Sequence, residues 1–201
     1  MRLSVQDLSC VRGGRTVFER LSFDAEPGKG VQLVGANGVG KSSLLRILAG
    51  FLPPAAGTFT LEGADEETPI GEFCHYVGHL NGVKRAFTVH ENLAFWADFL
   101  GGGEVDDALD AFNLLDLRDI PAGLLSAGQA RRLGLARLRL VERPLWLLDE
   151  PSVSLDEASR NILASTMEGH IAAGGLVIAA THLPLGVKFG QTLTLGAEGT
   201  S

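Results

Sequence analysis

Residues 35–42 read Gly-Ala-Asn-Gly-Val-Gly-Lys-Ser and fill every position of the phosphate-loop pattern G-x-x-x-x-G-K-[ST]. The apolar residues 31–34 before this segment predict a strand, and residues 43–49 after it predict a helix. A glycine-rich turn between a strand and a helix directs successive backbone N–H groups and the positive end of the helix dipole at one anion. The segment therefore predicts a binding site for a nucleoside triphosphate, formed by Gly35, Ala36, Asn37, Gly38, Val39, Gly40, Lys41, Ser42 and Ser43.

Two side chains of this loop and an acid pair further along the chain suit the chemistry of a bound triphosphate. Lys41 supplies positive charge to the phosphates, and the Ser42 hydroxyl is a ligand for Mg²⁺. Asp149 and Glu150 follow the apolar run 145–148, and the carboxyl end of a buried strand faces the crevice where such sheets bind ligands. We expect Asp149 to bind Mg²⁺ and Glu150 to act as general base toward a water molecule. The alternative is that the two acids only open a surface turn.

Alternating strand and helix patterns predict an α/β fold with a mostly parallel sheet and an inserted helical lobe. The predicted strands cover residues 3–10, 16–23, 31–34, 58–61, 73–77, 145–148, 176–180 and 192–195. The predicted helices cover residues 43–49, 92–100 behind a capping box at 88–91, about 105–115, 129–141 and 156–170. Four aromatic residues of the lobe, Phe87, Phe95, Trp96 and Phe99, are expected to form mostly a core stripe, although an exposed part of the lobe would suit a partner's helix.

Composition and charge exclude several classes of protein. The chain has 201 residues, enough for one domain with its own core, and a formal net charge of −7 at pH 7 without any Lys/Arg block. Nucleic acid is excluded as a partner, because binding a phosphate backbone needs clustered cations. We expect neither a secretion signal nor a membrane-spanning segment, because no run of about 18 apolar residues occurs. Cys10 and Cys74 lack metal-ligand spacing, which indicates buried thiols in a reducing compartment.

Residues 125–129, Leu-Ser-Ala-Gly-Gln, combine a hydroxyl with free backbone amides at the start of a predicted helix, which makes a second anion site or, alternatively, only an N-cap. The segment resembles the signature loop of ATP-binding cassette (ABC) proteins, with Ala127 where glycine is commoner. The resemblance extends over the whole chain: residues 154–156 are similar to the D-loop, and Thr181-His182 to the switch histidine near the γ-phosphate.

This resemblance implies a complete set of roles. It implies an ABC-type P-loop ATPase fold, in which a parallel core carries an N-terminal antiparallel β-subdomain and a helical subdomain at about residues 80–140, all within one ATP-binding domain, residues 1–201. His182 would hold Glu150 and the γ-phosphate in register. The implied assembly is a homodimer whose signature residues contact the partner's ATP, and whose D-loop crosses the dimer seam; these residues are Ser126, Ala127, Gly128 and Gln129, and Ser154, Leu155 and Asp156.

Two departures from the family pattern fall at nucleotide-contacting positions. The usual glutamine between core and lobe is His79, which can still accept from a Mg²⁺-bound water but makes the contact sensitive to protonation. The aromatic residue that stacks on adenine is missing near Val11-Arg12, where the Arg12 guanidinium would stack instead or lie solvated at the surface. The resemblance therefore leaves base selectivity open.

Weaker features narrow the resemblance further. Together with the Ala127 variant, residues 77–82, 84–85, 88–93 and 181–185 are similar to the ATP-binding subunit of bacterial cytochrome c maturation systems, which are haem exporters. That family implies a peripheral protein at the cytoplasmic face of the bacterial inner membrane, bound to integral membrane subunits, whose ATP hydrolysis drives release of the haem-loaded chaperone. The alternatives are a subunit of another ABC transporter and, less favoured, a soluble ABC ATPase outside transport.

Overall fold

A computed structural model describes residues 1–65 and 67–196 of the chain and divides them into two compact units. The first unit contains Met1–Gly78, Arg143–Pro151 and the described residues from Met167 onward, and the second contains His79–Glu142 and Ser152–Thr166. No helix among the described residues combines the length and apolarity needed to cross a membrane. Each unit has its own buried side chains and is described in turn.

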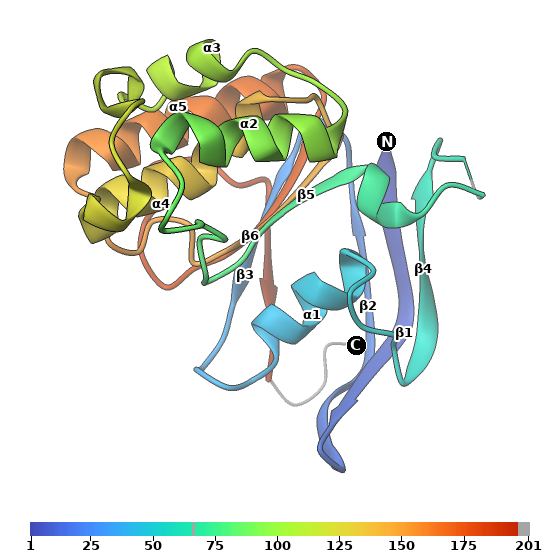
Figure 1. Cartoon of the computed structure of the whole chain (residues 1–201). Coiled ribbons are helices and arrows are strands. Elements are labelled where there is room, and N and C mark those ends of the chain that lie inside the picture. The colour runs from blue at the N-terminus through green and yellow to red at the C-terminus, as the bar shows by residue number, and fades with distance from the viewer. Residues whose placement is uncertain (66, 197–201) are drawn as a thin grey trace. The chain divides into compact units, whose positions relative to one another are not determined.

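An antiparallel three-stranded sheet opens the first unit, in the order β2-β1-β4 (Figure 1). It consists of β1 (Arg2–Arg12), β2 (Arg15–Ala25) and β4 (Ala56–Glu62). Along β1 the buried side chains are Leu3, Val5, Leu8 and Cys10, so the period of two is broken between Val5 and Leu8. The pairing register shifts there, and Asp7 has a φ of 48°. The bulge absorbs the extra residue and returns the apolar side chains to the same face.

A parallel five-stranded sheet carries the rest of the unit, in the order β5-β6-β7-β3-β8. Its strands are β3 (Gly30–Val34), β5 (Cys74–Val77), β6 (Leu145–Asp149), β7 (Leu176–Ala180) and β8 (Gln191–Thr194). Every residue of β6 and β7 is buried, which explains their continuous apolar sequences. Helix α1 (Lys41–Leu48) contributes Leu44, Leu45, Ile47 and Leu48 to a single core shared by both sheets. A short 3-10 helix, η1, covers Ile70–Glu72.

The second unit is helical. It contains α2 (Val89–Leu100), α3 (Val105–Asp110), η2 (Leu115–Leu117), η3 (Ala122–Leu124), α4 (Ala127–Ala136) and η4 (Arg137–Arg139), while α5 (Glu157–Ala172) begins here and ends in the first unit. The predicted capping box of α2 is present, because Thr88 Oγ1 accepts from the Glu91 N–H at 3.0 Å and Glu91 Oε2 accepts from the Thr88 N–H at 2.8 Å. The helix ends at Gly101 in the left-handed conformation, with a φ of 96°.

Three expectations about this unit were wrong in detail. The helix expected over 105–115 stops at Asp110, because the chain turns at Asn113 with a φ of 52° before η2. The helix expected over 129–141 starts earlier, at Ala127, and tightens into η4 after Ala136. The aromatic core stripe was also wrong for most of its members: Phe99 is 72% exposed, Phe95 is 41% exposed and Phe87 is exposed too. Their places in the core are taken by Leu93, Leu109, Phe112 and Leu114.

Candidate nucleotide site

The phosphate loop connects β3 to α1, as predicted, and its backbone conformation depends on glycine. Gly40 has a φ of 112°, and a Cβ atom there would lie 2.4 Å from Val17 Cγ1. Gly35 has a φ of 147°, and its Cβ would lie 2.6 Å from the Leu195 carbonyl oxygen. Side chains are therefore excluded at both ends of the loop, so its backbone can approach a ligand closely. Val39 packs against the core of the unit instead of lining the site.

The buried Lys41 side chain folds back over the loop that precedes it. Its Nζ donates to the carbonyl oxygens of Gly35 at 2.7 Å and Ala36 at 3.0 Å. An ammonium group has three protons, so these two bonds hold its charge above the loop and leave a third donor. The side chain lines a cleft of about 230 Å³, together with Asn37, Gly38, Gly40, Ser42, Ser43, Asp149 and Glu150.

Asp149 and Glu150 reach this cleft from the end of β6. Asp149 is buried and is the last residue of the strand, paired with Ala180 of β7. Its carboxylate and the Ser42 hydroxyl line the same cleft, and both are oxygen ligands of the kind Mg²⁺ prefers, so the residues present fit a magnesium ion. The alternative of a plain surface turn is not supported, because Asp149 is buried and Glu150 is largely so.

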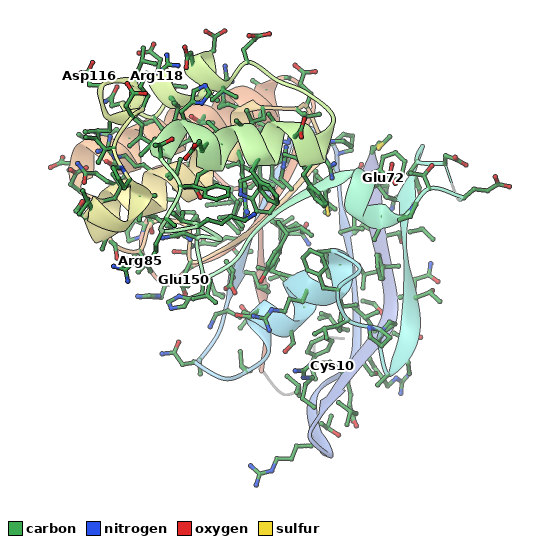
Figure 2. The ribbon with its side chains drawn as sticks, viewed as in Figure 1. Cys10, Glu72, Arg85, Asp116, Arg118 and Glu150 are labelled. Atoms are coloured by element: carbon green, nitrogen blue, oxygen red, sulfur yellow. The ribbon has the colours of Figure 1, made fainter. Side chains whose placement is uncertain are left out.

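Glu150 has an unusual backbone conformation and a defined side-chain partner. Its φ is 48°, and its N–H donates to the Ala180 carbonyl oxygen at 2.8 Å. Glu150 Oε1 lies 2.9 Å from Nδ1 of His182, the second residue after β7. A carboxylate only accepts, so the proton of this hydrogen bond belongs to Nδ1. The Glu150 side chain, labelled in Figure 2, is 17% exposed and the His182 side chain is 62% exposed, so the hydrogen bond joins a mostly buried carboxylate to an exposed imidazole.

One edge of the parallel sheet thus gathers all of these groups. The phosphate loop follows β3, Asp149 and Glu150 lie at the end of β6, and His182 follows β7; these three strands are neighbours in the sheet. Parallel strands place their carboxyl ends at the same edge, which is where open α/β sheets bind ligands. The structure therefore brings together the predicted phosphate loop, Asp149, Glu150 and His182 within the first unit.

The second unit holds the remaining predicted site residues. Ser126 caps α4: its Oγ accepts from the Gln129 N–H at 3.2 Å, and Gln129 Oε1 accepts from the Ser126 N–H at 2.8 Å. The first backbone hydrogen bond of α4 runs from the Ala130 N–H to the Ser126 carbonyl. The N–H groups of Ala127 and Gly128 come before it, so they have no acceptor within the helix. Both expectations for this segment, an N-cap and free amides at a helix start, fit the same geometry.

The segment similar to the D-loop lies against this helix start. A Cβ atom on Gly128 would approach the Ser154 carbonyl oxygen to 2.9 Å, and Ser154 has a φ of 67°. Leu155 is buried, and Asp156 Oδ1 accepts from the Ser159 N–H at 2.8 Å, which caps α5. Hydrogen bonding by Ser159, and more weakly the positive charges of Arg132 and Arg160, lowers the pKa of Asp156 below its ordinary value.

The two departures from the family pattern are both exposed. His79 is the first residue of the second unit and Arg12 ends β1 in the first. Sequence reasoning missed two polar residues beside the His79 segment, Arg131 and Asn92, both buried. The sequence placed Asn92 only within a helix and Arg131 only within the signature segment, and predicted a buried hydrogen-bonding role for neither. A charged or amide residue at an inward helical position was the signal available for both.

A parallel sheet with a phosphate loop, acid pair and histidine in one unit, and a helical second unit with a capped Ser-Ala-Gly-Gln turn, are the parts of the ATP-binding domain of ABC proteins. The ABC transporter family profile matches residues 18–153. The chain is 52% identical to the "Cytochrome c biogenesis ATP-binding export protein CcmA" of Rhodopseudomonas palustris strain BisB5, over 98% of this chain and 99% of that protein. The protein of the same name from Nitrobacter winogradskyi is 53% identical, over 93% and 94% of the two chains. The chain belongs to the ABC transporter family and, within it, to the CcmA proteins.

Solved structures agree with this fold. An ABC transporter ATP-binding protein from Pyrococcus furiosus superposes with a TM-score of 0.81 at 27% identity, covering 97% of this chain and 98% of that one. A bacterial Atm1-family ABC exporter with ATP bound superposes with a TM-score of 0.82 over 96% of this chain and 36% of the exporter chain. At 23% identity the exporter supports the fold alone. The predicted fold class, with its antiparallel subdomain and parallel core, is confirmed.

Proposed function

We propose that this chain is the ATP-binding and ATP-hydrolysing subunit of the cytochrome c biogenesis ABC complex, the bacterial haem exporter. The observation that carries the proposal is the 2.9 Å contact between Glu150 and His182 beside the cleft of the phosphate loop. An oriented carboxylate beside a phosphate loop supports hydrolysis, and not nucleotide binding alone, as the activity of this site. The relatives are named as export proteins of cytochrome c biogenesis, which supports the narrower assignment to the haem exporter.

Each group in the first unit has a defined task in this reaction. The loop N–H groups and Lys41 bind the β- and γ-phosphates and stabilise the charge that spreads over them. The Ser42 hydroxyl and Asp149 would hold Mg²⁺, which neutralises phosphate charge when bound. Glu150 accepts a proton from the water that attacks the γ-phosphorus, while the bond from that phosphorus to the β-phosphate oxygen breaks and ADP leaves. His182 holds Glu150 in place through Nδ1 and contacts the γ-phosphate.

The second unit supplies the remaining contacts in the proposal. His79 would accept from a Mg²⁺-bound water through a ring nitrogen, and Ser126, Ala127, Gly128 and Gln129 would contact the ATP of a second copy. Each chain has one phosphate loop and one signature loop, which supports a head-to-tail homodimer. Ser154, Leu155 and Asp156 would cross the dimer seam. Closing and opening of this dimer is the step that ATP drives.

The complex in this proposal includes integral membrane subunits, with the chain bound peripherally at the cytoplasmic face of the inner membrane. Hydrolysis would then drive release of the haem-loaded chaperone on the opposite side. The exposed aromatic side chains of α2 support contact with a partner, because large apolar side chains that gather at a surface mark interaction sites.

The experiment is a pair of substitutions followed by a pull-down. Glu150→Gln should retain ATP binding, lose hydrolysis by orders of magnitude and accumulate a nucleotide-bound dimer, whereas Lys41→Ala should lose ATP binding itself. The Glu150→Gln chain is then isolated with and without ATP from solubilised membranes, with partners identified by mass spectrometry and haem by absorbance. Recovery of haem-handling membrane proteins would support the proposal. Recovery of another permease would support an ABC transporter ATPase but contradict the haem-export assignment. Recovery of soluble partners alone would contradict a role in transport. Wild-type turnover in Glu150→Gln would refute the base assignment.

A further inference from the structure

The signature helix α4 carries a buried arginine that contacts the segment containing His79. Arg131 is 3% exposed, and its Nη1 donates to Asn81 Oδ1 at 3.0 Å. Both residues belong to the second unit, and Asn81 is two residues from His79. Burying a guanidinium costs free energy unless its protons are hydrogen-bonded, and the Asn81 amide oxygen accepts one of those of Arg131.

The next turn of α4 carries a glycine, which lets the same asparagine approach the helix backbone closely. Gly134 lies three residues after Arg131, on the same face of the helix. A Cβ atom at Gly134 would lie 3.1 Å from both Cβ and the carbonyl oxygen of Asn81. Glycine therefore permits the backbone of residue 81 to lie directly on the helix, while Arg131 holds its side chain. Together they fix Asn81 against α4.

A second buried side chain holds the other end of this segment. Asn92 of α2 accepts from the Lys84 N–H at 2.7 Å through Oδ1, and its Nδ2 donates to the Lys84 carbonyl at 3.0 Å and the Thr88 carbonyl at 2.9 Å. The backbone from residue 81 to residue 88 is thus attached at one end to α4 and at the other to α2. Exposed His79 extends from the end held by Arg131.

We propose that Arg131 is a positioning residue that couples the signature loop to His79. The inference rests on the proposed function, which gives Ser126 and Gly128 the partner's ATP and gives His79 the Mg²⁺-bound water. Ser126 caps the helix on which Arg131 lies five residues further on, so a displacement of the helix start reaches Asn81 through one rigid turn and one hydrogen bond. Occupancy of the partner's nucleotide site then sets the position of His79 in the chain's own site.

The test compares Arg131→Met with Arg132→Met. Arg132 is the adjacent residue of α4, and its Nη1 donates to the carbonyls of Phe112 and Asn113, each at 2.8 Å, so it controls for loss of an arginine that stabilises the same helix. Arg131→Met should lower kcat by about 10- to 100-fold, as loss of a residue that orients a metal ligand does, and should raise the Mg²⁺ concentration for half-maximal rate. Nucleotide affinity at the phosphate loop should stay within about threefold of wild type. Arg132→Met should leave the Mg²⁺ dependence unchanged.

Hydrogen–deuterium exchange provides a readout that does not depend on turnover. In the Glu150→Gln background with Mg²⁺ and ATP, the parent chain should become protected at both residues 126–131 and residues 79–83. With Arg131→Met added, protection at 126–131 should remain while protection at 79–83 is lost, and Asn81→Ala should reproduce this pattern if the arginine variant folds poorly. With Arg131 intact, Asn81→Asp still offers the guanidinium an acceptor, so this variant should keep protection at both 126–131 and 79–83.

The outcomes separate this inference from the proposed function. If the parent chain neither hydrolyses ATP nor dimerises with nucleotide, the proposed function fails. If it does both, but Arg131→Met and Asn81→Ala match Arg132→Met in Mg²⁺ dependence and in exchange at 79–83, Arg131 is only structural and the inference is overturned.

Discussion

Replacing His182 with alanine removes one hydrogen bond from Glu150 and leaves the phosphate loop intact. The lost bond joins Nδ1 to Oε1 at 2.9 Å, and hydrogen bonds to charged groups contribute about 1.5–3 kcal/mol. Because the histidine is 62% exposed, water replaces part of the bond, so the lower part of that range applies, about 1.5–2 kcal/mol. At about 1.4 kcal/mol per factor of ten, kcat should fall at least about 10- to 30-fold, and by more if the proposed contact of His182 with the γ-phosphate is lost too.

Steady-state phosphate release at saturating ATP gives kcat, and titration with a fluorescent ATP analogue gives affinity. Affinity should stay within about threefold of wild type, because Lys41 and the loop amides are unchanged. His182→Asn should recover part of the rate, since its amide N–H replaces the Nδ1 donor. His90→Ala, which alters a half-buried histidine 3.9 Å from Asp106 in the helical unit, should leave kcat unchanged.

A kcat for His182→Ala within threefold of wild type, with ATP still bound, would refute the reasoning. So would a rate for His182→Asn equal to that of alanine, because the hydrogen bond to Glu150 would then not be what the histidine contributes. Thermal unfolding of each variant identifies losses due to folding, which should be small at so exposed a position.

Three further outcomes follow from single residues. Gly40→Ala should lower the free energy of unfolding by about 2–5 kcal/mol in a denaturant titration, because its left-handed φ and the Val17 contact leave no room for Cβ. Burial raises the pKa of the Cys74 thiol to about 11, so it should resist alkylation at pH 8 until the chain is unfolded. The pKa of Asp156 is lowered, so its carboxylate stabilises the fold above the ordinary value of 3.8; the melting-temperature advantage of wild type over Asp156→Asn should be present at neutral pH and shrink as pH falls below about 4.

The parts of the fold that a local pattern determines were predicted closely. Strands β6 and β7 are buried on both faces and read as continuous apolar runs, and the capping box of α2 satisfies its own backbone groups. The site at the sheet edge was predictable for the same reason, because a phosphate loop after one strand and acids after another meet wherever the strands are parallel. The expected Glu150–His182 contact needed the family resemblance, since a histidine after an apolar strand is otherwise unremarkable in sequence.

The errors arose where burial depends on packing between distant segments. The aromatic residues of α2 follow helical spacing, yet Asn92 and Leu93 occupy the inward positions, and Phe95 and Phe99 face outward. Asn92 is inward because its side chain bonds the Lys84 N–H and the carbonyls of Lys84 and Thr88, contacts that form only once the loop is folded. Hydrophobicity alone ranks phenylalanine above asparagine at a buried position, so the prediction that the aromatic residues form a core stripe was wrong.

The residues expected to act in hydrolysis are divided between the two units. Glu150 and Ser154 are four residues apart, yet the boundary between units falls between Pro151 and Ser152. Both residues hold a positive φ, 48° and 67°, a conformation that costs a side-chain-bearing residue about 1–3 kcal/mol and persists only where surrounding contacts enforce it. Those contacts come from separate units: the Ala180 carbonyl holds Glu150, while the Ser154 carbonyl lies against Gly128 of the signature loop. The positive φ values of Glu150 and Ser154 therefore lie on either side of the boundary between the units, and each is accompanied by contacts within its own unit.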